Sequence, residues 1–283
     1  MRYKIISDSS SDLFALDSVA FSSVPLKVIT DEKEYIDTAA LDVDGMVSDL
    51  RKYSGVSRSS CPNTQDWKSA FEDYEGVFCV TITSGLSGSC NSANAAMSDY
   101  LMKNPEKKGF VIDTLSAGPE VALIAEKLRD LICEGISFEE IKAKIEEYKN
   151  RTHLIFSLES LRNLANNGRT SMAAAKFAGL LGIRAIGKAS LEGTLELTDK
   201  VRGAKNAIST VFGNMLSNGY IGGRVRIHHC QNSDSAKTLA EMIKEKFPKA
   251  CVIIEKTGAL CSFYAESGGL LIGYEGSKKP SLA

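Results

Sequence analysis

Two adjoining segments organise this chain: Val77-Phe78-Cys79-Val80-Thr81-Ile82 and, directly after it, Thr83-Ser84-Gly85-Leu86-Ser87-Gly88-Ser89. The first segment is short, apolar and rich in β-branched residues, which predicts a buried strand. The second is a turn of small residues, and residues 91–97 after it favour a helix. The start of a helix has unpaired N–H groups and a positive dipole end. The pattern therefore predicts an anion site where the strand passes into the helix.

The hydroxyls of this turn also have a simpler interpretation. Ser87 or Ser89 is placed to cap the first turn of the helix, which is the usual role of a serine in that position. No lysine follows Gly88, so the turn is not a phosphate-binding loop. In Gly85-Leu86-Ser87-Gly88 the second glycine comes one position too early for a nucleophile elbow. From this turn alone, capping and anion binding both remain open.

Composition excludes several classes of protein. At 283 residues, 43% of them hydrophobic and 24% charged, the chain is long enough for two modest domains with a real core. A net charge of -1 without a long basic run argues against nucleic acid as a partner. We expect a cytoplasmic protein, because no apolar leader or membrane-spanning segment is present. Seven scattered cysteines fit reduced thiols, and three histidines without ligand spacing predict no metal site.

Along residues 1–150, predicted strands alternate with predicted helices. The strands are expected at residues 4–6, 24–29, 77–82 and 109–114, the helices at 41–53, 64–71, 91–97, 119–132 and 138–148, and a loop at 56–64. Alternation of this kind predicts a parallel sheet with helices on both faces. Ligands bind beyond the carboxyl ends of the strands in such a sheet. We expect four polar turns at that edge, at Asp8, Ser59, Ser84 and Thr114.

A second α/β domain is predicted for residues 151–283, after a charged stretch at residues 148–152. Its strands are expected at residues 153–157, 225–229, 251–254 and 270–274, and its helices at 158–166, 173–181, 203–216 and 235–247. Residues 184–189 and 194–197 form a predicted hairpin around Glu192-Gly193. Helix 173–181 is rich in small apolar residues, which allow close packing or leave room for an apolar ligand.

Five short motifs, in order along nearly the whole chain, resemble the DegV family. They are Ser7-Asp8-Ser9-Ser10-Ser11-Asp12-Leu13, Ser59-Ser60-Cys61-Pro62, Thr83 to Ser89, Leu164 through Asn167-Gly168-Arg169, and Lys200-Val201-Arg202-Gly203. The resemblance implies two α/β domains, 1–150 and 151–283, with a long-chain fatty acid buried between them and no other cofactor. The better-studied members of this family are the fatty-acid-binding subunits of bacterial fatty acid kinase. They present the acyl carboxyl group to a separate ATP-dependent kinase subunit.

The resemblance also implies roles for individual residues. The implied fatty-acid-binding residues are Ser59, Ser60, Thr83, Ser84, Gly85, Ser87 and Gly88. Among them, Ser59 replaces a threonine of the family, and Ser87 matches the serine that hydrogen-bonds the carboxylate. Arg169 and Arg202 match basic residues implicated in docking the kinase subunit. Exchange of the lipid implies transient contact with a membrane.

The chain also departs from the family pattern. Cys61 stands where glutamine is usual, and the family's His-Thr-Gly-Pro-Gly appears as Ala265-Glu266-Ser267-Gly268-Gly269. The histidine that commonly assists the carboxylate is therefore absent. Tyr264 and His229 are the candidate replacements. Lipid binding tolerates this change better than the kinase-linked function does.

Two other functions are compatible with the sequence. A serine hydrolase would use Ser87 as its nucleophile and His228 or His229 as its base, although the elbow spacing fails. A regulatory module would sense a different amphiphile. A lipid carboxylate needs fixed donors in a dry pocket, and hydroxyls with helix-start N–H groups supply them. We therefore expect a lipid-binding protein without a catalytic centre of its own.

Overall fold

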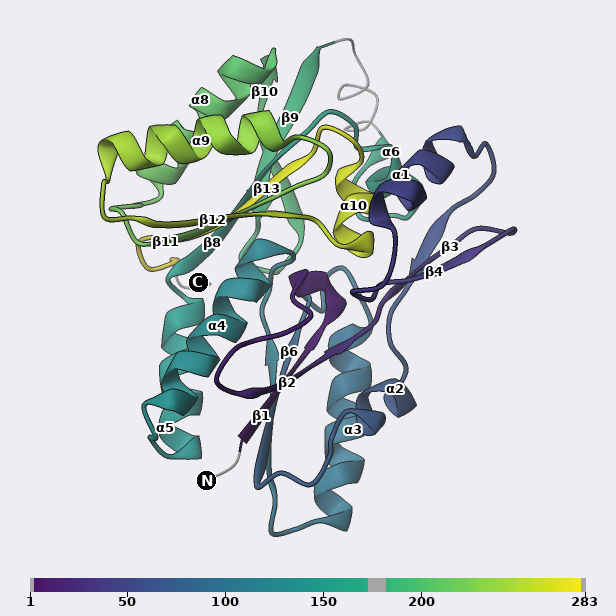
Figure 1. Cartoon of the computed structure of the whole chain (residues 1–283), viewed down its shortest axis with the longest axis vertical. Helices are drawn as coiled ribbons and strands as arrows, with labels where there is room; N and C mark the ends of the chain where they lie inside the picture. Colours follow the sequence, from purple (N-terminus) through teal and green to yellow (C-terminus); the bar gives the residue numbers. More distant parts are fainter. Residues whose placement is uncertain (1–2, 173–181, 281–283) are drawn as a thin grey trace.

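The structure is a computed structural model, and it describes residues 3–172 and 182–280. Its N-terminal half is built on a four-stranded parallel sheet, sheet A, with strand order β2-β1-β6-β7. Figure 1 shows this sheet in the lower half of the view. Its strands are β1 (Tyr3–Asp8), β2 (Ala20–Val24), β6 (Gly76–Thr81) and β7 (Lys108–Asp113). The parallel sheet predicted for this half is confirmed, and its organising strand, β6, is buried along its whole length.

Helices cover both faces of sheet A, as predicted. The helices of this half are α1 (Val43–Lys52), α2 (Thr64–Ser69), α3 (Ser89–Lys103), α4 (Pro119–Cys133) and α5 (Phe138–Lys149). Side chains alternate between the two faces of a strand. Phe78 therefore joins the core beneath α4 and α5, whereas its neighbour Val77 joins the core beneath α2 and α3.

The C-terminal half is built on a mixed six-stranded sheet, sheet C, with order β10-β9-β8-β13-β11-β12. Its strands are β8 (Thr152–Leu158), β9 (Ile183–Ala189), β10 (Leu195–Arg202), β11 (Arg224–His229), β12 (Cys251–Lys256) and β13 (Leu270–Glu275). The predicted hairpin is confirmed as the antiparallel pair β9–β10. Helices α8 (Ala204–Ser217) and α9 (Ser233–Lys246) pack on one face of sheet C (Figure 1). The opposite face of sheet C packs against the N-terminal half, chiefly against helix α4.

A third, small sheet corrects two predictions. The single strand predicted over 24–29 is divided at Pro25, because a proline cannot donate a ladder hydrogen bond. Strand β2 ends before it in sheet A, and β3 follows it in sheet B, whose order is β4-β3-β5. The strands of sheet B are β3 (Lys27–Ile29), β4 (Glu34–Ile36) and β5 (Arg58–Ser60). The loop predicted over 56–64 is therefore wrong at residues 58–60, where antiparallel pairing with β3 satisfies the backbone.

The short helices also differ from prediction. The helix expected over 158–166 is reduced to α6 (Arg162–Asn166), because β8 continues to Leu158. Two further short helices, η1 (Ser9–Ser11) and α10 (Ala259–Ala265), have too few residues to show a periodic pattern. The N-cap of α3 is Gly88, without a side-chain cap, so neither Ser87 nor Ser89 occupies that position. The helix predicted over 173–181 lies outside the described residues.

Helix α4 joins the two halves of the chain. It packs on β1 and β6 of sheet A and on β8, β11 and β13 of sheet C. Two of its glutamates are buried between the sheets. Glu126 pairs with Arg226 of β11, and Glu120 accepts hydrogen bonds from Thr152 and Lys279, each at 2.8 Å. The domain boundary expected at residue 150 falls between α5 and β8 and stays a prediction.

Candidate functional site

A cavity of about 310 Å³ is lined by residues from both halves of the chain. Most of its wall is apolar. Strand β8 supplies Leu154, Phe156 and Leu158, which share one face because side chains alternate along a strand. The other apolar lining residues are Leu26, Ile82, Leu86, Ala117, Leu164, Leu195, Leu260, Ala265 and Leu271. A cavity with this volume and lining suits an apolar small molecule.

Polar groups interrupt the apolar wall in one region. The lining residues that carry polar atoms, sulfur or exposed backbone there are Ser59, Ser60, Cys61, Ser87, Gly88, Arg169, Cys261 and Tyr264. We call five of them the polar cluster: Ser59, Ser87, Gly88, Arg169 and Tyr264. They come from β5, from the turn before α3, from the segment after α6 and from α10. Elements far apart in the sequence therefore bring their polar groups together in the wall of one apolar cavity.

A buried carboxylate holds the turn that carries Ser87 and Gly88. Asp8, at the end of β1, is completely buried. Its Oδ2 atom accepts hydrogen bonds from the Ile82 N–H at 3.0 Å and from the Ser89 hydroxyl at 2.6 Å. Asp8 thereby ties the end of β1 to the end of β6 and to the start of α3. The expectation that the Asp8 and Ser84 turns meet at one sheet edge is confirmed.

Ser59 lies on β5, and its hydroxyl oxygen is 2.7 Å from the phenol oxygen of Tyr264 on α10. The neighbouring Ser60 hydroxyl donates to the backbone carbonyl of Cys61. Of the two candidate replacements for the missing histidine, Tyr264 lines the cavity and His229 does not. From the sequence Tyr264 is one of two candidates, because no local pattern predicts the short helix that carries it.

Arg169 lies in the cavity lining, which is not where a residue reserved for a partner is expected. Its Nε donates to the carbonyl of Leu86 at 3.2 Å, and its Nη1 donates to the carbonyl of Asn167. Both acceptors are neutral, and no carboxylate within the described residues forms an ion pair with it. Arg202, at the end of β10, is exposed and outside the lining. The structure therefore separates two arginines that the sequence grouped together.

Three predicted ligand-binding residues are not in the lining. Thr83 accepts the Gly85 N–H at 3.1 Å, and the Ser84 N–H donates to Asp113 at 3.1 Å. Gly85 lies under the tip of the β9–β10 hairpin, where an added Cβ would meet the carbonyl of Gly193 at 2.9 Å. Thr83, Ser84 and Gly85 shape the turn and support the hairpin tip.

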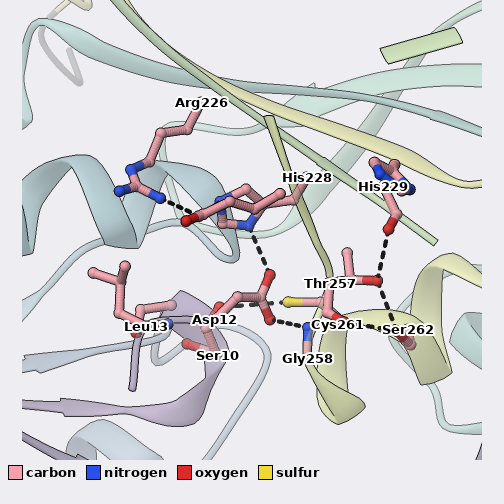
Figure 2. Close-up of polar contacts among 12 residues, drawn as sticks. Ser10, Asp12, Leu13, Arg226, His228, His229, Thr257, Gly258, Cys261 and Ser262 are labelled. Atoms are coloured by element: carbon pink, nitrogen blue, oxygen red, sulfur yellow. Dashed lines mark hydrogen bonds and ion pairs between the residues drawn. The ribbon is translucent and has the colours of Figure 1, made fainter. Parts of the chain in front are cut away.

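The three histidines of the chain are all outside the cavity lining. Figure 2 shows the ring of His228 directed at Asp12, with Nδ1 2.7 Å from the carboxylate. Burial opposes its charge, but hydrogen bonds with Asp12 and Glu255 raise the pKa of His228 above its usual value. The ring is completely buried, and its Nδ1 atom faces Asp12 rather than the cavity. Ser87 therefore lacks the partner that a serine hydrolase needs.

Two kinds of feature are absent from the described residues. No group of three or more histidine, cysteine, aspartate or glutamate side chains among them is arranged to hold a metal ion. Within residues 3–172 and 182–280, no helix has the length and apolar character needed to cross a membrane.

Fold and cavity together define an α/β protein with two large sheets and one small sheet, in which the wall of an apolar cavity carries a cluster of hydroxyls and one arginine. The chain belongs to the DegV family. The family model described as "Uncharacterised protein, DegV family COG1307" matches residues 2–275. A DegV domain-containing protein of Streptococcus pneumoniae is 45% identical over 279 residues, which cover 97% of this chain and 99% of that protein.

Two solved structures have the same fold. The Fatty Acid Kinase (Fak) B3 protein of Streptococcus pneumoniae, loaded with linoleic acid, is 44% identical to this chain with a TM-score of 0.96. The match covers 98% of this chain and 100% of that protein's chain. A DegV family protein from Eubacterium eligens, loaded with heptadecanoic acid, is 42% identical to this chain with a TM-score of 0.95. That match covers 97% of this chain and 100% of the other chain. Members of this family with the same fold therefore hold fatty acids.

Proposed function

We propose that this chain binds one long-chain fatty acid in the cavity and presents its carboxyl group to a separate kinase subunit. The observation that carries the proposal is Arg169, a cation that lies in the wall of an apolar cavity and donates to two neutral backbone carbonyls. A fatty acid carboxylate supplies the missing negative charge. Burial of its tail adds about 0.8 kcal/mol per methylene group.

The fatty acids in the two similar structures support this assignment, and the name of the Streptococcus pneumoniae protein supports a kinase partner. The exposed position of Arg202 keeps it as the proposed docking residue. Arg169 is reassigned to the carboxylate, together with Ser59, Ser87 and the backbone of Gly88. The hydrolase alternative is not proposed further, because no histidine lies beside Ser87.

Protein purified from a bacterial host should carry a long-chain fatty acid, because an apolar cavity with a cluster of polar groups in its wall retains such a ligand. Organic extraction followed by mass spectrometry identifies it, and native mass spectrometry gives its stoichiometry. The expected result is one fatty acid per chain. Protein that is isolated empty, and that also ignores added palmitate and oleate, would show that the cavity has another occupant.

Ser87→Ala should weaken palmitate binding by about 1–3 kcal/mol, since a buried charged acceptor loses one donor. Ser217→Ala is the matched control, because this serine is exposed on α8 and donates to the Gly213 carbonyl. Displacement of a fluorescent fatty acid measures both variants. If Ser59→Ala combined with Ser87→Ala leaves the affinity unchanged, the head group binds elsewhere.

A further inference from the structure

Two hydroxyls from distant elements meet inside the cavity wall. Ser59 on β5 and Tyr264 on α10 are 205 residues apart, and their oxygens are 2.7 Å apart. Both side chains line the cavity, and either oxygen can be the donor when the cavity is empty. The direction of this hydrogen bond therefore depends on what else Ser59 contacts.

Both hydroxyls are held on rigid supports. Ser59 pairs with Val28 in sheet B. Helix α10 is fixed at its N-terminal end by two carboxylates of the N-terminal half. Asp12 accepts the Gly258 N–H at 2.8 Å, and Asp37 accepts the Ala259 and Leu260 N–H groups at 2.7 and 3.1 Å. Figure 2 shows Asp12 between His228 and Gly258 at this end of the helix. The 2.7 Å contact is therefore built into the fold before a ligand arrives.

A proton count sets the direction of the bond in the loaded protein. A serine hydroxyl has one proton, and a carboxylate only accepts. If Ser59 gives its proton to the carboxylate, its contact with Tyr264 survives only when the phenol is the donor. We infer that Tyr264 is a positioning residue: its phenol donates a hydrogen bond to the Ser59 oxygen. The Ser59 hydroxyl is thereby oriented so that its own proton is donated to the carboxylate of the ligand. This inference rests on the proposed function.

The surroundings keep the phenol able to donate. Burial raises the pKa of Tyr264, while its hydrogen bond with Ser59 and the nearby charge of Arg169 act in the opposite direction. The net shift is upward, so the phenol keeps its proton at neutral pH. Hydrogen bonds in a chain polarise one another, so the Tyr264 proton strengthens the donation by Ser59. The pair therefore favours a free acid over a neutral lipid such as a methyl ester.

The test compares palmitate with methyl palmitate, which has the same tail but no charged acceptor. Tyr264→Phe removes one oxygen and keeps the ring that packs on Phe263. We expect its affinity for palmitate to fall about tenfold, the upper part of the range for one hydrogen bond, while methyl palmitate binding stays unchanged. In the Ser59→Ala background the same change should have no further effect on palmitate, because Tyr264 acts through Ser59.

Tyr220→Phe is the matched control, because this phenol bonds to the Gly223 carbonyl in the separate core beneath α8 and α9. It should bind both lipids as the parent protein does. Equal weakening of acid and ester in Tyr264→Phe, additivity with Ser59→Ala, or no effect on palmitate would each overturn the inference while leaving lipid binding intact. A parent protein that binds no fatty acid would instead overturn the proposed function, and the inference with it.

Discussion

Replacing Arg226 by alanine should destabilise the protein by about 3–5 kcal/mol, because it leaves a buried glutamate without its counter-charge. The Arg226 guanidinium donates to both oxygens of Glu126 on α4, at 3.0 and 2.7 Å, and also to Glu255 on β12. The Arg226 and Glu126 side chains are only 6% and 8% exposed. Urea unfolding of Arg226→Ala and of the parent protein measures the difference in their free energies of unfolding.

Lys256→Ala is the control, because it breaks an ion pair with Asp44 in which both side chains are more than half exposed, at 70% and 53%. Such a pair contributes about 1 kcal/mol or less. Exchanging both buried partners, Arg226→Met with Glu126→Leu, should recover most of the stability, because no unpaired charge remains on α4. An Arg226→Ala variant as stable as Lys256→Ala would show that Glu126 reaches water or another cation.

Arg169→Ala should lower the affinity for palmitate by about 1.5–3 kcal/mol, the usual contribution of a hydrogen bond between charged groups at a half-buried site. The loss should be much smaller for methyl palmitate, which brings no charge into the cavity. Isothermal titration of delipidated protein measures both ligands. Equal losses for acid and ester would mean that Arg169 supports the wall rather than the carboxylate.

Arg202→Ala is the counterpart of this variant. Because Arg202 is exposed and outside the lining, its removal should leave palmitate affinity unchanged. It should instead lower acyl-phosphate formation when the loaded protein is combined with a kinase subunit. A normal kinase rate in Arg202→Ala would remove it from the proposed docking surface.

Local patterns were sufficient to predict most of the fold. The apolar β-branched run that became β6 predicts a buried strand by itself, and the alternation of strands and helices along residues 1–150 predicts the parallel sheet. Errors occurred where pairing partners are distant or elements are short. Strand β5 has only three residues, and its strand character comes from β3, about thirty positions earlier.

The candidate site was predicted in part for the same reason. Ser59 and Ser87 were named from motifs, and both line the cavity. The position of Arg169 depends on its contact with the carbonyl of Leu86, which is 83 residues away in the sequence. No local pattern reports a contact of that separation. Helix α10 was missed because its anchors, Asp12 and Asp37, come from the other end of the chain.

The origin of the cavity walls has a consequence for the order of events during synthesis. Lining residues run from Leu26 to Leu271, so the N-terminal sheet can fold on the ribosome long before the last wall is made. A nascent chain that ends before β13 has the turn of Ser87 but lacks Leu271, which belongs to the cavity wall. The wall of the cavity is therefore complete only once translation has passed β13.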